Sequence, residues 1–258
     1  LDVCSSDLNV YKADAIIPLA AIVGAPACAK DPHRAWGTNT QQINRILSFM
    51  SPSQIILFPN TNSGYGTTAP GVVCTEDTPL NPISVYGQSK QESEKLVLNH
   101  PQGIVFRFAT LYGASPRMRL DLLVNDFVHK ANQGFPSPIL LFEGNFRRNY
   151  LHVKDAAFAF VFALEHPEHK RQQAYNAGDS RANLTKIQLC EKIKEYVPSF
   201  QWIMNSNQKD PDQRDYEVSN AKLEALGWRR GVTLDDGIKE LLRCYQQPFL
   251  GKQYQNAV

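Results

Sequence analysis

The residue pair best suited to chemistry in this sequence is Tyr86 and Lys90, which lie four positions apart. On a helix, residues i and i+4 share one face, so the hydroxyl and the ammonium can point into one cleft. A free tyrosine has a pKa of about 10, and a nearby ammonium favours its phenolate. The pair is therefore a candidate general base for an alcohol. The alternative is two surface residues of an amphipathic helix.

The elements around this pair are predicted to hold it at one edge of a parallel sheet. Pro79 and Pro82 prevent an earlier helix start, and the pattern predicts a helix over residues 84–99. Residues 54–58 and 104–108 are short apolar runs of the kind that form strands buried on both faces. The carboxyl ends of such strands face the ligand crevice of an open sheet.

Composition restricts the class of protein. With 258 residues, 43% of them hydrophobic and 20% charged, the chain can form one large or two modest globular domains. A net charge of +2 gives no reason to expect a nucleic-acid or membrane partner. The scattered cysteines favour reduced thiols and a cytoplasmic location. His166 and His169 lie in a polar stretch, and we expect no metal site there.

Four motifs around the pair resemble, in this order, those of the extended short-chain dehydrogenase/reductase family, in its sugar-nucleotide epimerase/dehydratase branch. They are DAIIPLAA at 14–21, PNTNSGYG at 59–66, RFATLYG at 107–113 and RNYLHVKD at 148–155. The resemblance covers residues 11–242. It implies a doubly wound parallel α/β sheet of the Rossmann type with a small C-terminal substrate-binding lobe. It also implies NAD as cofactor, with NADP left open, and a nucleoside diphosphate sugar as partner.

The start of the chain departs from the family pattern. No G-x-x-G-x-x-G turn is present near it, and residues 15–19 resemble the family's fourth strand. We therefore expect a truncated dinucleotide-binding domain that binds NAD weakly, the alternative being a shorter protein. The predicted division is 1–113 with 148–178 for the NAD-binding domain, 114–147 with 179–246 for the substrate-binding lobe, and 247–258 for a flexible tail.

The resemblance assigns catalysis to Thr61, Tyr86 and Lys90. Tyr86 would take the proton of the sugar C4 hydroxyl with help from Thr61, while Lys90 would orient the nicotinamide ribose and lower the Tyr86 pKa. The alternative for Thr61 is a hydroxyl that stabilises a turn. The other cofactor-binding positions implied are Leu19, Ala20, Ala21, Asn39, Pro59 and Phe108. Asn39 could equally be a helix-start residue.

Arginines are predicted to hold the substrate diphosphate, because a guanidinium fork matches phosphate oxygens. Arg148 and Arg214 match family positions, and Arg119 is a weaker candidate. For each the alternative is a surface arginine. The other predicted substrate-binding residues are Asn62, Ser63, Thr110, Leu140 and Phe142.

The residues after Thr61 bear on the reaction. In 4,6-dehydratase relatives the catalytic threonine is followed by Asp and Glu, whereas Asn62 and Ser63 follow it here. An amide cannot exchange a proton at neutral pH, so the sequence favours a C4 epimerase or C4 oxidoreductase over a dehydratase. A small-carbonyl reductase of the same superfamily and a non-catalytic nucleotide-sugar or NAD-binding module also stay open.

Self-association is the last expectation. Relatives commonly dimerise through the two helices that correspond to residues 39–50 and 84–99 here. Both segments show an apolar stripe, so we expect a homodimer. The alternative is that both stripes face only the sheet.

Overall fold

The computed structural model describes residues 10–69, 71–116, 118–134, 138–166, 171–205 and 214–246. The predicted tail at 247–258 and His169 lie outside the described residues. Within the described part, no helix is long and apolar enough to cross a membrane. The same part contains no cluster of three or more His, Cys, Asp or Glu side chains suited to a metal ion.

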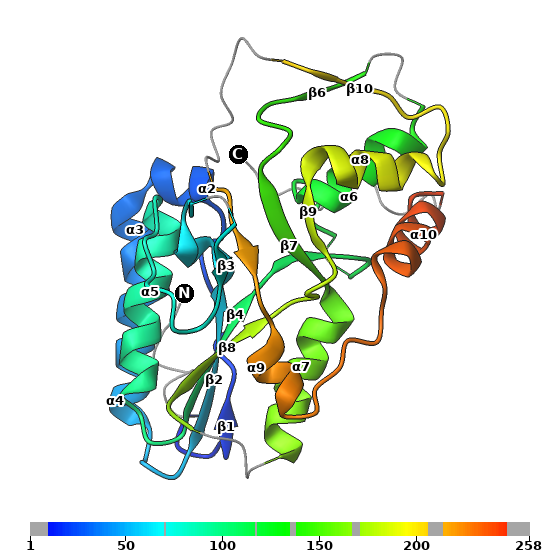
Figure 1. The fold of residues 1–258 in the computed structure, drawn as a ribbon. Helices are drawn as coiled ribbons and strands as arrows, with labels where there is room; N and C mark the ends of the chain where they lie inside the picture. Colours follow the sequence, from blue (N-terminus) through cyan, green and yellow to red (C-terminus); the bar gives the residue numbers. More distant parts are fainter. Residues whose placement is uncertain are drawn as a thin grey trace.

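The central sheet has four parallel strands in the order β1-β2-β4-β8. Their bounds are Ala15–Ile16, Ile55–Thr61, Gly103–Phe108 and Gln173–Ala177. Thr61 pairs in register with Phe108, and Phe108 with Ala177, so three strands end at one level. Helices cover both faces (Figure 1), which confirms the predicted doubly wound α/β fold.

One face of the sheet is covered by α4 (Gln42–Phe49) and α5 (Val85–Leu98), next to which α2 (Ala25–Lys30) and α3 (Pro32–Trp36) lie. The buried side chains between sheet and helices are Ile43, Ile56, Phe58, Val97, Val105 and Ala174. Ile46, Leu47 and Met50 of the apolar stripe also pack there, so the stripe of α4 faces the sheet.

Residues 24–32 contain a glycine and two prolines, yet they contribute to two short helices. Proline is tolerated in the first turn of a helix, where its missing N–H has no intrahelical partner. Pro26 opens α2 in this way, and Pro32 opens α3. The side chain of Asp31 then caps α3 by accepting a hydrogen bond from Arg34 N at 2.9 Å.

The opposite face is covered by α7 (Val153–Glu165) and by the short α9 (Ala221–Ala225). Leu57, Phe106 and Phe108 of the sheet pack there against Ala159 and Phe162. An apolar core on each face is what an all-parallel sheet requires.

The remaining described elements form a second cluster with its own core, which includes residues 110–112 and 147–152 beside parts of the predicted substrate-binding lobe; the division into domains stays a prediction. It contains the sheet β5-β7-β9, a pairing of β6 with β10, and three helices. The strands are β5 (Thr110–Tyr112), β6 (Ile139–Leu141), β7 (Arg147–His152), β9 (Asn183–Thr185) and β10 (Trp202–Met204). The helices are α6 (Leu123–Asn132), α8 (Lys186–Lys194) and α10 (Leu234–Tyr245). A further pair, β3 (Val73–Cys74) with β11 (Glu217–Val218), lies between this lobe and the central sheet.

Candidate active site

The first two turns of α5 carry Tyr86 and Lys90. Ser84 caps this helix by accepting a hydrogen bond from Gly87 N at 3.2 Å. Tyr86 is partly buried and Lys90 is 4% exposed, with its Nζ 3.8 Å from the ring centroid of Phe58 on β2. Among the described residues, neither the Tyr86 hydroxyl nor Lys90 Nζ has a hydrogen-bond partner. These two polar groups are therefore suited to a ligand rich in hydroxyls, such as a ribose or a sugar.

Burial moves the pKa values of the two groups in opposite directions. Burial raises the pKa of Tyr86 to about 12, against the opposing charges of Arg214 and Arg119. Burial lowers the pKa of Lys90 to about 7. The groups that act to lower the Tyr86 pKa in this structure are Arg214 and Arg119, and the predicted effect of Lys90 on that pKa stays a prediction.

Thr61 ends β2 and caps the short 3₁₀ helix η2 (Asn62–Tyr65), against which α5 packs. Its hydroxyl accepts a hydrogen bond from Ser63 N at 3.1 Å and lies 2.6 Å from Ser63 Oγ. The turn-stabilising role is thus present. Because Thr61 is only partly buried, its hydroxyl also stays within reach of a ligand.

Asn62 is the unusual residue of this turn. It is 1% exposed, and among the described residues neither its Oδ1 nor its Nδ2 has a hydrogen-bond partner. A buried amide with both polar atoms unpaired costs free energy. Asn62 is therefore a candidate ligand contact between Thr61 and Ser63.

Asn39 joins the loop after β1 to α5. The helix-start alternative is wrong, because Asn39 lies within a π-helical turn, η1 (Gly37–Gln41), that connects α3 to α4. Its Oδ1 accepts from Ile22 N at 2.8 Å, while its Nδ2 donates to Ile22 O at 3.0 Å and to Ser89 Oγ at 3.1 Å. Single π turns inside helices occur frequently at functional sites.

The other predicted cofactor-binding positions divide into two groups. Leu19, Ala20 and Ala21 lie on the loop after β1, where Leu19 is 69% exposed, and Pro59 is partly buried on β2. The ring of Phe108 instead stacks 5.7 Å from that of Phe106 within the hydrophobic core. The Phe108 side chain is therefore committed to packing, and only its main chain is left for a ligand.

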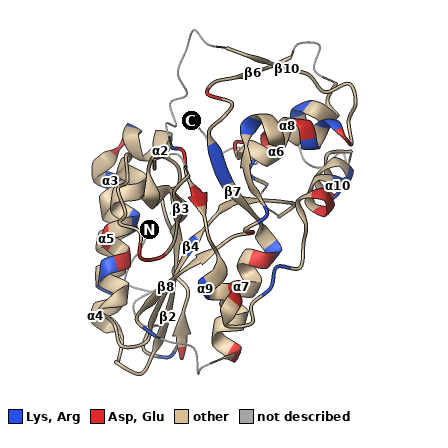
Figure 2. Ribbon diagram, in the orientation of Figure 1, with Lys and Arg blue, Asp and Glu red and all other residues tan. Residues whose placement is uncertain are grey.

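The predicted arginines have three different environments. Arg148, on the basic stretch of β7 (Figure 2), is 4% exposed, so the surface alternative is wrong for it. Its Nη1 donates to Arg147 O at 2.8 Å and to Arg214 O. Arg214 is partly buried, and its charge acts on Tyr86. Arg119 forms a bidentate pair with Asp121 at 2.7 and 2.6 Å, which fills its guanidinium fork.

Two predicted substrate residues, Leu140 and Phe142, lie away from Tyr86 and Lys90. Leu140 is 50% exposed on β6, and the main-chain carbonyl of Phe142 accepts a hydrogen bond from Lys186 Nζ at 2.7 Å. In Figure 1, β6 and β10 lie beyond α8, apart from α5. Thr110 pairs with Tyr150 between β5 and β7. The structure therefore gathers Thr61, Asn62, Ser63, Tyr86 and Lys90 around β2 and α5 but leaves Leu140 and Phe142 outside.

Sequence reasoning missed three buried polar residues beside the site: Asn60, Glu94 and Arg107. Glu94 lies four positions after Lys90, on the same face of α5. Arg107 is a charged residue within the otherwise apolar strand β4, and it is 6% exposed. Both features were visible as signals, because a charge at a core position is almost always paired.

The chain matches a family model over residues 4–178, described as the NAD dependent epimerase/dehydratase family. It is similar to an uncharacterised UDP-glucose epimerase of Bacillus subtilis, with 26% identity over 87% of this chain and 72% of the relative. It is also similar to a UDP-glucose 4-epimerase of Lactobacillus helveticus, with 25% identity over 91% of this chain and 77% of the relative.

Solved structures show the same fold. A mutant of UDP-glucuronic acid 4-epimerase from Bacillus cereus, in complex with UDP-4-deoxy-4-fluoro-glucuronic acid and NAD, superposes with a TM-score of 0.81. The match covers 93% of this chain and 78% of the other at 20% identity. At this identity the likeness supports the fold alone.

Proposed function

The chain belongs to the NAD-dependent epimerase/dehydratase family, and from that premise we propose that it acts on a nucleoside diphosphate sugar at C4. The reaction is a 4-epimerisation, or an oxidation that leaves a 4-keto sugar. The observation that carries the proposal is the pair on α5, a Tyr86 hydroxyl and a Lys90 ammonium that share one helix face and have no hydrogen-bond partner among the described residues.

The residues present fit the ribose end of the cofactor. Lys90 Nζ, which is buried beside Phe58, would donate hydrogen bonds to the ribose hydroxyls. The loop of Leu19, Ala20 and Ala21, tied to α5 through Asn39, would lie alongside. When bound, NAD supplies the hydride acceptor and donor for the sugar C4 carbon.

The chain's own groups move the proton. Tyr86 takes it from the C4 hydroxyl as the C4–H bond breaks, which leaves a carbonyl at C4. In an epimerisation Tyr86 returns the proton when hydrogen is restored to the opposite face. Burial opposes this role, because it raises the pKa of Tyr86 to about 12, and the positive charges of Arg214 and Arg119 offset only part of that effect. The Thr61 hydroxyl would form a hydrogen bond with the C4 oxygen both when C4 carries a hydroxyl and when it is a carbonyl.

The substrate class follows from the arginine near Tyr86. Arg214 is the proposed diphosphate ligand, and Arg148 would act mainly by holding the main chain of Arg214 in place. The relatives are named for UDP-glucose, which makes a UDP-sugar the first substrate to test.

Elimination of water is disfavoured at this site. It needs an acid and a base near C5 and C6, and the two positions after Thr61 hold an amide and a hydroxyl, Asn62 and Ser63. The Ser63 hydroxyl is already engaged with Thr61 at 2.6 Å. Among the described residues, no carboxylate bonds to any of these three side chains.

The test is to incubate the chain with UDP-glucose at saturating NAD and to follow the sugar by proton NMR. The expected product is the C4 epimer or the 4-keto sugar. Tyr86→Phe should lower the rate by about 10²- to 10⁴-fold, the range of general acid–base catalysis. Full activity in this variant, or no conversion of any nucleoside diphosphate sugar tried, would contradict the proposal.

A further inference from the structure

A buried ion pair lies directly behind the proposed catalytic residues. Arg107 on β4 and Glu94 on α5 are 6% and 4% exposed, and Arg107 Nη2 lies 2.6 Å from Glu94 Oε1. Arg107 Nε lies 3.2 Å from both carboxylate oxygens. Removing two charges from water costs about as much as their attraction returns, so apolar residues of similar volume are often equally stable there. Stability alone does not account for this pair.

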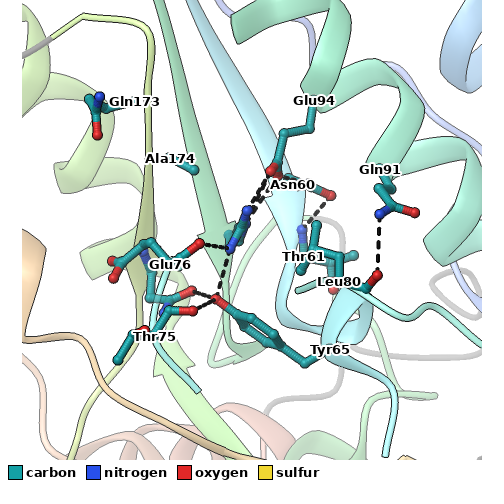
Figure 3. A network of polar contacts seen from close by, with 12 residues as sticks. Asn60, Thr61, Tyr65, Thr75, Glu76, Leu80, Gln91, Glu94, Gln173 and Ala174 are labelled. Carbon is teal, nitrogen blue, oxygen red and sulfur yellow. Dashed lines mark hydrogen bonds and ion pairs between the residues drawn. The ribbon is translucent and has the colours of Figure 1, made fainter. Parts of the chain in front are cut away.

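The Glu94 carboxylate is also connected to the main chain of Thr61 through the side chain of Asn60 (Figure 3). Asn60 Nδ2 donates a hydrogen bond to Glu94 Oε2. Asn60 Oδ1 in turn accepts one from Thr61 N at 2.8 Å. Consecutive contacts therefore run from β4 through α5 to the last residue of β2.

Glu94 lies on the same helix as Tyr86 and Lys90, so these contacts link strand β2 to the proposed catalytic residues. Tyr86, Lys90 and Glu94 follow one another at intervals of four, so they lie on one face of the helix. The i+4 neighbour would be the ordinary ionic partner of Lys90. Glu94 instead bonds to Arg107 and Asn60, and no ion pair of Lys90 exists among the described residues. Its carboxylate thus fixes strand β2 against the helix that carries the pair.

Arg107 holds the turn after Thr61 from a second side. Its Nη1 donates to the Tyr65 hydroxyl at 3.0 Å and to Glu76 O at 3.0 Å. The Tyr65 hydroxyl donates to Asn176 Oδ1 on β8 at 2.7 Å. Burial acts to lower the pKa of Arg107, but the hydrogen bonds that Arg107 donates to Glu94 and the charge of that carboxylate raise it, so the guanidinium stays charged.

We propose that Glu94 and Arg107 form a positioning pair for the reaction. Through Asn60 they set the main chain of Thr61 relative to Tyr86 and Lys90, so that the Thr61 hydroxyl and the Tyr86 hydroxyl meet the same sugar oxygen. This inference rests on the proposed function of Thr61, Tyr86 and Lys90. Small displacements of a group that contacts the reacting atoms reduce rates strongly, because catalysis depends on alignment.

The main experiment replaces both charges at once, with Glu94→Leu and Arg107→Met. The midpoint of urea unfolding should stay close to that of the unaltered chain, since no buried charge is left unpaired. The kcat for the nucleotide sugar should fall about 10- to 100-fold. Its KM should change less than about threefold, because the proposed diphosphate ligand Arg214 is untouched.

A second variant, Asn60→Ala, breaks the same connection without touching the ion pair. It should lower kcat as much as the double replacement, and the triple combination should lower it no further, because all three residues act through one path. If the double replacement does not fold, Asn60→Ala alone decides the question.

Hydrogen exchange at the Thr61 amide gives a readout that does not depend on activity. This N–H donates to Asn60 Oδ1, so both variants should speed its exchange about tenfold or more, while the amide of Val105 in central β4 keeps its rate. The control replaces another largely buried pair, with Asp179→Leu and Arg230→Met, where the side chains are 11% and 13% exposed. This control should change neither kcat nor the Thr61 exchange.

The outcomes separate the two proposals. Unchanged Thr61 exchange in the Asn60 and the double variants would overturn the positioning role, whatever the activity. Unchanged kcat in an active enzyme would overturn it as well. An unaltered chain without activity on any nucleotide sugar would refute the proposed function, and faster Thr61 exchange would still support the connection itself.

Discussion

Tyr86 and Lys90 illustrate how burial affects single residues. The helix spacing that aligns them was predictable from sequence, because i and i+4 always share a face. Their pKa values were not, since these depend on which side chains enclose them after folding. Phe58 comes from strand β2, more than thirty positions before Lys90, and its ring centroid lies 3.8 Å from Lys90 Nζ. The same limit explains why Glu94 and Arg107 were missed, because their partners are set by tertiary contacts.

The lowered pKa of Lys90 predicts a pH-dependent stability. Its pKa is about 7 in the folded chain and 10.5 ordinarily, so between these values the unfolded chain holds a proton that the folded chain lacks. The contribution of Lys90 to stability is thus most unfavourable below pH 7 and improves as the pH rises. The slope is about 1.4 kcal/mol per pH unit.

Lys90→Met should therefore be more stable than the unaltered chain at pH 6, with the difference shrinking steadily toward pH 10. Urea unfolding of both proteins across this range measures it. A constant difference at every pH would show that Lys90 has an ordinary pKa in the folded protein.

Arg214 should contribute to substrate binding more than a surface arginine does. A charge-assisted hydrogen bond contributes roughly 1.5–3 kcal/mol, so Arg214→Ala should raise KM for a nucleoside diphosphate sugar about tenfold or more. Arg181→Ala is the matched control, because that side chain is 75% exposed, and its KM should not change. Equal KM values in the two variants would remove Arg214 from the proposed site.

At the scale of elements, the long periodic or apolar segments were predictable and the short irregular ones were not. Strands β2 and β4 and helix α5 lie within three residues of their predicted bounds. Helix α2 was missed, because proline usually interrupts a helix, whereas Pro26 sits in a first turn. The π turn around Asn39 was missed as well, since it is held by contacts with Ile22 and Ser89 that are distant in sequence.

The start of α5 should be sensitive to a single methyl group. A Cβ at Gly87 would lie 2.7 Å from Pro82 Cβ, whereas one at Gly37 would meet no atom closer than 3.8 Å. Gly87→Ala should therefore cost about 1–3 kcal/mol of stability and reduce kcat by displacing Tyr86. Gly37→Ala should leave stability and kcat unchanged. Thermal unfolding and steady-state kinetics of the two variants measure the difference. Unchanged values for Gly87→Ala would show that the first turn of α5 adapts without cost.

At the scale of the molecule, the homodimer stays a prediction. The exposed residues of α4 and α5 are polar: Gln42, Asn44, Arg45, Ser48, Gln88 and Lys95. Their apolar neighbours Ile46, Leu47 and Leu98 pack toward the sheet. A dimer through these helices would therefore join two largely polar faces. If the dimer forms, light scattering should give a molar mass of twice the 29.0 kDa of one chain. The mass of a single chain would contradict the homodimer.

A redox change at C4 of a nucleotide sugar is the central claim made for this protein. The direct measurement is incubation with a nucleoside diphosphate sugar and NAD in deuterated water, followed by mass spectrometry and NMR of the product. Redox chemistry at C4 predicts a product of unchanged mass with inverted C4, or one lighter by two hydrogens, with no deuterium at C5 in either case. A product that has lost one water and carries deuterium at C5 would contradict it, because elimination would then occur at a site with Asn62 and Ser63 in place of two carboxyl groups.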